Sequence, residues 1–373
     1  MFNIIRKEVH IMNQIILYVM AVGAVIGGID HMLGNRWGFG VRFEEAFRLL
    51  GPIGLSMAGI ICLAPALSQG LGRVVVPLFT ALGLDPGIFG SILAIDMGGY
   101  QMAMDLAADP AIGRFSGIIV SAIFGCTVVF TIPVGLGAVR EADRPFFTRG
   151  ILLGLVSMPA GILAGGLAFG LSAGTILFQT FPILLISAAL FIGLVKAPGA
   201  VVRGFSVFAR GVQVLASLGL MLGAVQYMTG FCPLGSLTPL TEAMETVCAI
   251  GIVMLGSMPL AELVQRLMKA PFRWIGRHTG LNEVSTTGLL IGLVSVTPAL
   301  AMIPRMDERG KVLCGASVVC GASAFSAHLG FALSAEPEMA APLLLAKLLG
   351  CAVGVILALA TTRREMREAK KGV

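Results

Sequence analysis

Apolar runs long enough to cross a lipid bilayer recur along the whole chain, and they constrain its fold more than any other feature. A helix of about 20 residues spans the hydrocarbon core of a membrane. Only 12% of the residues are charged, against roughly a quarter in a soluble domain. The runs lack the alternation of polar and apolar residues expected of barrel strands. We therefore predict an all-α, polytopic integral membrane helix bundle.

The bounds of the expected membrane segments follow from these runs. They are 13–33, 49–69, 87–108, 115–138, 150–171, 174–196, 205–229, 245–263, 284–304, 312–333 and 339–361. A piece punctuated by Pro and Gly, 71–86, precedes the third. We expect residues 1–361 to form a single transmembrane domain and residues 362–373 to form a charged, disordered cytoplasmic tail.

Lys and Arg gather in the loops beside the runs, where they set the orientation of a membrane protein. If 71–108 and 284–304 each enter the membrane and return to the same side, nine segments cross it. The loops that then face the cytoplasm carry 21 of the 26 Lys and Arg residues. We therefore predict two re-entrant or discontinuous segments. The net charge of +6 belongs to these loops and indicates no nucleic-acid partner. The expected surroundings are a lipid bilayer.

The second half of the chain repeats the first at a displacement of 197 residues. The string Gly-x-x-Met-x-Gly at 54–59 falls on the same string at 251–256, and Asp85 falls on Asn282. Under the topology above the two copies have opposite orientations. The sequence thus favours the inverted-repeat plan of secondary transporters.

The copies extend over about 49–139 and 245–333. Close helix packing is indicated by small residues four positions apart, such as Gly161 and Gly165. A homo-oligomer is compatible with this pattern.

Asp96 is the strongest candidate for a functional side chain. It lies in the apolar segment 87–108. A carboxylate in such a place costs about 2.5–3.5 kcal/mol on insertion scales, and intramembrane charges usually face a wet cavity. Gly98 and Gly99 follow it, and glycines let a ligand approach the backbone. We predict that a small cation binds here. The alternative is a structural aspartate paired with a neighbouring donor.

Tyr100 and His328 are the candidate polar partners for such a ligand. Tyr100 follows Asp96 by one helical turn, so it could donate a hydrogen bond or present its ring to an ammonium. An interface aromatic residue is an equally good interpretation. His328 lies deep in the segment 312–333 and could bind substrate or relay a proton. It could also be a core histidine bonded to a carbonyl.

Three further residues are candidate gate or proton sites. Glu262 lies near the end of the segment 245–263, where a membrane-boundary role is the competing interpretation. Asp105 precedes Asp109 and is expected at the water boundary. Thr131 falls opposite His328 in the repeat, in a Thr-Ile-Pro-Val string that favours a break in the helix.

Neither a metal site nor a cofactor is expected. The seven cysteines form no Cys-x-x-Cys pair, and the four histidines show no ligand spacing. The string Gly170–Gly174 fits Gly-x-Ser-x-Gly, but that motif needs a strand–turn–helix context. An enzyme built on Ser172 and His328 is therefore disfavoured, and we predict no enzymatic activity.

Several motifs together resemble the ethanolamine utilisation permease family over nearly the full length of the chain. They are Phe43–Glu45, Leu63–Leu67, Asp96–Tyr100, Ile132–Val134, Arg305–Val312 and His328–Ala332. Ala327 stands where the family pattern often has an acidic residue. The loops and tail are shorter than in typical members.

The resemblance implies a multi-pass protein of the bacterial cytoplasmic (inner) membrane that imports ethanolamine by alternating access or facilitated diffusion. Ethanolamine is a small protonated amine, so Asp96 would be its counter-charge, with Gly98, Gly99, Tyr100 and His328 around it. The alternative is a Na⁺- or H⁺-coupled secondary transporter of another small solute, such as an amino acid or nucleoside.

Overall fold

The fold is taken from a computed structural model that describes the backbone of residues 2–93, 96–232 and 234–369. The side chains of residues 2–13, 96, 275 and 363–369 lie outside that description. Every regular element in the described part of the chain is helical. The expected all-α class is thereby confirmed.

The long helices account for most of the chain. They are α1 (Phe2–Met32), α3 (Leu50–Ala81), α8 (Arg144–Phe169), α10 (Phe181–Lys196), α11 (Pro198–Thr229), α12 (Leu240–Thr279) and α17 (Ala340–Ala369). The shorter α-helices are α2 (Phe39–Arg48), α4 (Ile88–Ile92), α5 (Gly99–Leu106), α6 (Pro110–Arg114), α7 (Leu136–Ala138), α9 (Ala173–Gln179), α13 (Glu283–Gly292), α14 (Val296–Met302), α15 (Glu308–Gly321) and α16 (Ala327–Ala335).

Tighter and wider turns connect these helices. Between α6 and α7 the chain winds as π-helix, η2 (Phe115–Gly125) and η3 (Thr127–Gly135). The 3₁₀ turns are η1 (Asp96–Gly98), η4 (Glu141–Asp143), η5 (Ile303–Arg305) and η6 (Pro337–Met339). π-Helices are uncommon and concentrate at functional sites.

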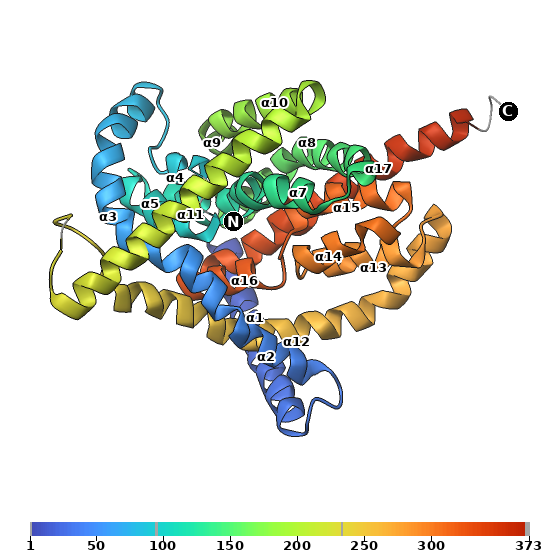
Figure 1. The fold of residues 1–373 in the computed structure, drawn as a ribbon, viewed down its shortest axis with the longest axis horizontal. Helices are drawn as coiled ribbons and strands as arrows, with labels where there is room; N and C mark the ends of the chain where they lie inside the picture. The colour runs from blue at the N-terminus through green and yellow to red at the C-terminus, as the bar shows by residue number, and fades with distance from the viewer. Residues whose placement is uncertain (1, 94–95, 233, 370–373) are drawn as a thin grey trace.

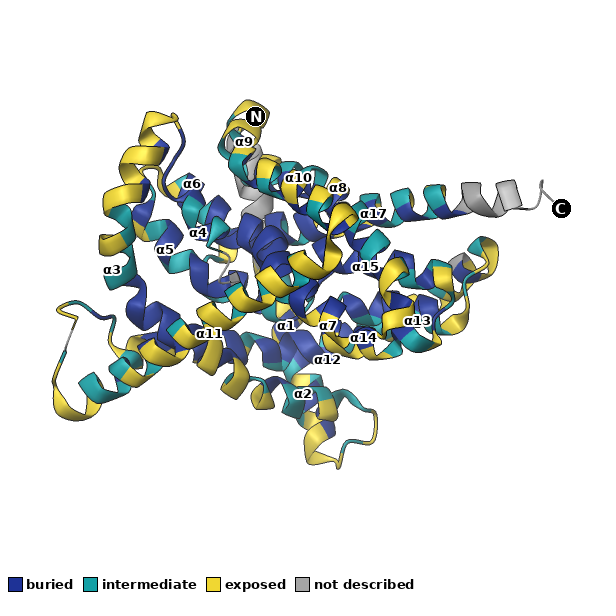
Figure 2. Cartoon of the chain, turned by 45° about the horizontal axis from the view of Figure 1, so that its top comes forward, coloured by how far each residue is buried: buried dark blue, intermediate teal, exposed yellow. Residues whose placement is uncertain are grey.

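Within the described residues, seven helical stretches are long and apolar enough to cross a membrane, or eight if the bent pair α9 and α10 forms one span. Their burial separates an inner layer from an outer one. In the apolar 18-residue window of Pro110–Ala138, 83% of the residues are buried, against 17% in the corresponding window of Pro198–Thr229. Figure 2 shows the buried residues gathered at the centre and exposed faces on α3 and α11. The outward apolar side chains of α11, such as Val207 and Val214, have the character of a lipid-facing surface.

The expected segment 312–333 is not one continuous span. Helix α15 ends at Gly321, and α16 begins at Ala327. Ser323 between them has a left-handed φ of 52°, which a helix interior does not accept. The break lies against a second break, between α13 and α14, because Phe325 N–H donates to the Leu293 carbonyl (3.1 Å). Apolar content alone does not reveal such an interruption.

The C-terminal helix is longer than the apolar run that predicted it. We expected the helix to end at 361, but α17 continues through Ala369. The added residues are charged and have good intrinsic helix propensity, which lets a helix extend beyond its membrane span.

Aspartate caps start the helices that follow the two broken segments. Asp109 precedes α6 and accepts a hydrogen bond from Ala111 N–H (2.8 Å). Asp307 precedes α15 and accepts one from Gly310 N–H (3.2 Å). Each cap satisfies a helix N–H that has no intrahelical partner, and so fixes where the helix after the break begins.

Two close crossings join the N-terminal and C-terminal parts of the bundle. A Cβ on Gly59 of α3 would overlap the Ala216 carbonyl oxygen of α11, and a Cβ on Gly256 of α12 would overlap the Met20 carbonyl oxygen of α1. Glycine is required at both crossings, since any side chain would push the helices apart. In Figure 1, α11 passes across α3, and α12 runs along the opposite side of the molecule beside α1.

Candidate functional site

A pocket of about 340 Å³ lies where α5, α12 and α16 meet. Its lining includes both polar and apolar side chains. The lining residues are Ile61, Met97, Gly98, Tyr100, Gln101, Glu242, Glu245, Thr246, Ala249, Phe331, Ser334 and Ala335. The volume suits a ligand of a few heavy atoms with some water.

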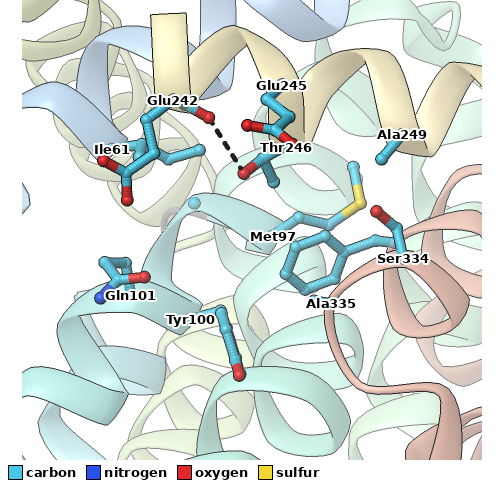
Figure 3. Close-up of a pocket in the computed structure, with 12 residues that line it drawn as sticks. Ile61, Met97, Tyr100, Gln101, Glu242, Glu245, Thr246, Ala249, Ser334 and Ala335 are labelled. Atoms are coloured by element: carbon cyan, nitrogen blue, oxygen red, sulfur yellow. Dashed lines mark hydrogen bonds between the residues drawn. The ribbon is translucent and has the colours of Figure 1, made fainter. Parts of the chain in front are cut away.

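Two carboxylates form one wall of this pocket. Glu242 and Glu245 lie in the first two turns of α12, and Figure 3 shows both side chains beside the cavity. Both residues are exposed. Thr246 shares their edge of the helix and donates its hydroxyl hydrogen to the Glu242 carbonyl oxygen (3.4 Å). Two acidic side chains with a nearby hydroxyl make this wall suited to a cation.

Helix α5 supplies the opposite wall. Tyr100 donates its phenol hydrogen to Glu336 Oε1 (2.8 Å), and its ring meets the Phe331 ring edge-on at 5.7 Å. Gln101 donates its amide to Asp105 Oδ1 (2.9 Å). Figure 3 places both α5 side chains across the cavity from Glu242 and Glu245. These bonds fix the rotamers of the wall before any ligand arrives.

An ion-pair cluster adjoins the Tyr100 side of the pocket. Arg114 of α6 lies 3.1 Å from Glu336 Oε1 and 2.6 Å from Glu338 Oε1. Glu336 therefore accepts a hydrogen bond from Tyr100 and forms an ion pair with Arg114. The cluster ties the segment after α5 to the turn between α16 and α17.

The predicted site residues are only partly brought together. Gly98 and Tyr100 line the pocket. Gly99 is buried beside it, where a Cβ would lie 2.7 Å from the Gly90 carbonyl oxygen, so its role in this fold is close backbone packing. The side chain of Asp96 lies outside the described residues, although its backbone begins the η1 turn that carries Gly98.

His328 lies elsewhere. It is buried at the start of α16, with Nδ1 3.1 Å from the Ala322 carbonyl oxygen, and it is not among the residues that line the pocket. This arrangement matches the core-histidine interpretation. A direct role in binding stays a prediction.

The three candidate gate residues occupy separate places. Asp105 accepts hydrogen bonds from Ser68 (3.2 Å) and Gln101 (2.9 Å) at the exposed end of α5. Glu262 is paired with Arg42 (3.0 Å) and Arg266 (2.9 Å), which fits a structural residue at the membrane boundary. Thr131 is fully buried in η3, and among the described residues its hydroxyl has no hydrogen-bond partner.

Ser172 has a structural task in the Gly-x-Ser-x-Gly string. Its hydroxyl accepts a hydrogen bond from Thr175 N–H (3.1 Å) and so caps α9. Ser172 is on the surface, whereas His328 is buried in α16.

Lys347 is a residue that the sequence analysis missed. It is fully buried in α17, and Nζ donates to the carbonyl oxygens of Ala322 (2.8 Å), Ala122 (2.9 Å) and Cys320 (3.3 Å). The available signal was a lone lysine within the apolar run 339–361, which by itself marks a functional candidate. Glu242 and Glu245 were missed because they lie at the edge of a span, where charge is ordinary.

Comparison with known protein families matches residues 12–361 to the family described as ethanolamine utilisation protein, EutH. The chain is 37% identical to a probable ethanolamine permease EutH of Listeria monocytogenes, over 96% of both chains. It is 32% identical to the protein of the same description from Escherichia coli, over 93% of this chain and 95% of that one.

A third relative carries no functional description. The uncharacterized protein YxeR of Bacillus subtilis is 38% identical over 91% of this chain and 92% of its own length. No solved structure matches the chain.

Proposed function

The chain belongs to the EutH family of ethanolamine utilisation proteins, and from this premise we propose that it is a permease that carries ethanolamine across the bacterial inner membrane. A transporter role follows from the relatives named as probable permeases and from the helices long enough to cross a membrane. The substrate and the mechanism are our proposal.

One observation carries the proposal for the site. The pocket that holds Gly98 and Tyr100 is also lined by two carboxylates, Glu242 and Glu245. Ethanolamine is protonated at neutral pH, as lysine is, and losing its hydration shell requires compensating charge. An acidic wall supplies this compensation. We propose that the ammonium of the substrate lies beside Glu242 and Glu245.

The other end of ethanolamine is a hydroxyl, which both donates and accepts hydrogen bonds. Gln101, Thr246 and Ser334 line the same cavity and offer matching groups. Tyr100 contributes its ring face to the ammonium, because its phenol is already engaged with Glu336. Asp96, which directly precedes the lining residues Met97 and Gly98, is the proposed second counter-charge.

For the mechanism we propose alternating access between two inverted halves. The helix bounds support this duplication at a displacement of 197 residues. Adding 197 to the bounds of α1 (2–32) gives 199–229, and α11 extends over 198–229. Adding 197 to the bounds of α8 (144–169) gives 341–366, which lies within α17 (340–369). The close crossings at Gly59 and Gly256 are related by the same displacement. In such transporters the substrate site lies where broken helices of both halves meet.

The deciding experiment is uptake of labelled ethanolamine into proteoliposomes that hold the purified protein, with and without an imposed Na⁺ or proton gradient. Saturable uptake that is blocked by excess unlabelled ethanolamine supports the proposal. Uptake that equilibrates without a gradient indicates a facilitator, and accumulation that needs a gradient indicates a coupled carrier. Protein that takes up an amino acid or nucleoside but not ethanolamine overturns the substrate assignment.

Ethylamine makes a matched competitor, since it keeps the ammonium and lacks the hydroxyl. If the polar side chains of the pocket bind the hydroxyl, ethylamine should compete at least about tenfold more weakly, because a site left with unpaired polar groups rejects such an analogue. Equal competition by ethylamine would mean that the site recognises the ammonium alone.

A further inference from the structure

The buried amine of Lys347 lies at the end of a broken helix. Its acceptors Cys320 and Ala322 are the last-turn residue and the C-cap of α15, and Ala122 belongs to η2. Carbonyl oxygens at the C-terminal end of a helix carry partial negative charge and attract cations. Lys347 therefore places its amine at a natural cation position.

The geometry requires a charged amine. Three carbonyl oxygens surround Nζ at 2.8, 2.9 and 3.3 Å, and a carbonyl oxygen can only accept. The ammonium group has three donor hydrogens and no lone pair. A neutral amine would have two hydrogens for three acceptors and would turn its lone pair toward one of them. The three contacts are matched only by the ammonium.

The place of this ammonium within the fold has a functional meaning. The chain from 322 to 326 is not helical, and it packs against the second break at 293–295, where Ser326 donates to the Val294 carbonyl (2.6 Å). In secondary transporters, unwound carbonyls and the C-terminal ends of half-helices are the groups that coordinate a coupling Na⁺. Here the ammonium of Lys347 binds these carbonyl groups instead.

We propose that the Lys347 ammonium is a tethered cation that takes the place of a coupling Na⁺ at the C-terminal end of α15, so that the carrier works without Na⁺. This inference rests on the proposed transport function. It assigns Lys347 as a positioning residue, because it holds the break through backbone carbonyls and is not among the residues that line the substrate pocket. It also predicts that removing the side chain creates a binding site for a small alkali cation.

The test compares two substitutions that remove the charge. Lys347→Ala opens space next to the three carbonyls, whereas Lys347→Met fills most of the same volume with an apolar chain. Thermal unfolding of each purified protein is measured in sodium, lithium and N-methyl-D-glucamine chloride at equal ionic strength. We expect the melting temperature of the wild type to be the same in all three media.

Lys347→Ala should melt lower than the wild type in N-methyl-D-glucamine and should recover by several degrees in sodium or lithium, because a ligand that binds only the folded state stabilises it. Lys347→Met should melt lower without recovery. Uptake should follow the same pattern, with Na⁺ dependence only in Lys347→Ala.

Three results overturn the proposal. The first is a wild-type protein that Na⁺ stabilises or whose uptake needs Na⁺. The second is a folded Lys347→Ala protein whose melting temperature is the same in sodium, lithium and N-methyl-D-glucamine chloride. The third is a Lys347→Ala protein that fails to fold even with sodium present throughout purification, since the added ion should then replace the missing charge.

Failure of the proposed function gives a different result. The unfolding measurements need no substrate, so the melting pattern can hold in a protein that takes up no ethanolamine. In that case the ethanolamine assignment fails, while the proposal of a tethered cation is retained for a carrier of another solute.

Discussion

The side chains of Lys347 and His328 share one acceptor, the carbonyl oxygen of Ala322, at 2.8 and 3.1 Å. Because this oxygen can only accept, His328 must carry its proton on Nδ1. Together the two side chains hold the first residue after α15 from two directions. The conformation of the break is thus held in part by residues from α16 and α17, outside the loop itself.

The first prediction concerns His328. His328→Asn places an amide donor near the position of Nδ1, so it should keep the bond to Ala322 and near-normal uptake. His328→Ala should lose at least about 1 kcal/mol of unfolding free energy, the usual net contribution of a single hydrogen bond. Melting temperature and ethanolamine KM are the measurements. A His328→Asn protein with native stability but a strongly raised KM for ethanolamine would indicate that His328 binds the substrate directly.

The fold class could be predicted from the sequence because it depends on local composition. Long apolar runs force helices in a membrane, where every backbone polar group must be satisfied internally. The helical class can therefore be predicted without knowing which segments pack against one another.

The parts that were missed depend on contacts between distant segments. Glu242 reaches the pocket only because α12 and α5 line the same cavity, and no local pattern indicates that arrangement. The break at 322–326 is stabilised by bonds to 293–295, so the run that contains it still looks continuous. His328 is polar and lies deep in its segment, but depth alone does not distinguish a pocket from a packed core, so its role in binding stays a prediction.

The second prediction concerns the acidic wall. Glu242→Gln and Glu245→Gln keep the size of each side chain and remove its charge. Each should raise the KM for ethanolamine at least about fivefold, because a close charge pair contributes on the order of 1 kcal/mol even in water-like surroundings. The matched control is Glu44→Gln, which breaks an exposed pair with Arg48 on α2. If both pocket variants keep the wild-type KM, the ammonium binds elsewhere.

The third prediction concerns a buried ion pair far from the pocket lining. Lys311 Nζ lies 2.7 Å from Asp143 Oδ1, and both side chains are about nine-tenths buried. Asp143→Asn should lower stability by about 3 kcal/mol, because it leaves a buried charge without its partner. The double variant Asp143→Asn with Lys311→Met should be more stable than the single one. Additive losses in thermal unfolding would show that the two side chains are not coupled.

The fourth prediction tests the crossing of α3 and α11. Gly59→Val introduces a Cβ that overlaps the Ala216 carbonyl oxygen, so the helices must separate, at a cost of about 1–3 kcal/mol or more. The control is Gly211→Ala on α11, where a Cβ would meet nothing within 4 Å. That change should be neutral or slightly stabilising, since alanine favours helix by about 1 kcal/mol over glycine. Equal melting temperatures for the two variants would contradict the close crossing.

The last prediction concerns Asp96. A charged residue in an apolar span costs about 2.5–3.5 kcal/mol on insertion scales, so Asp96→Asn should fold at least as well as the wild type. If Asp96 is the counter-charge for the ammonium, the same variant should lose ethanolamine uptake. Stability and activity would then change independently, which distinguishes a functional carboxylate from a structural one. Expression level, melting temperature and uptake are measured together.

Asp105→Asn is the control for that substitution, since it lies in the same segment at the exposed end of α5 and is bonded to Ser68 and Gln101. An asparagine can keep both contacts, because its side-chain oxygen can accept from Gln101 while its amide nitrogen donates to the Ser68 hydroxyl, so most of the uptake should remain. Normal uptake by a well-folded Asp96→Asn protein would remove Asp96 from the transport path. Loss of uptake in Asp105→Asn alone would move the essential carboxylate to the exposed end of α5, where the first step of transport would be the capture of a hydrated cation.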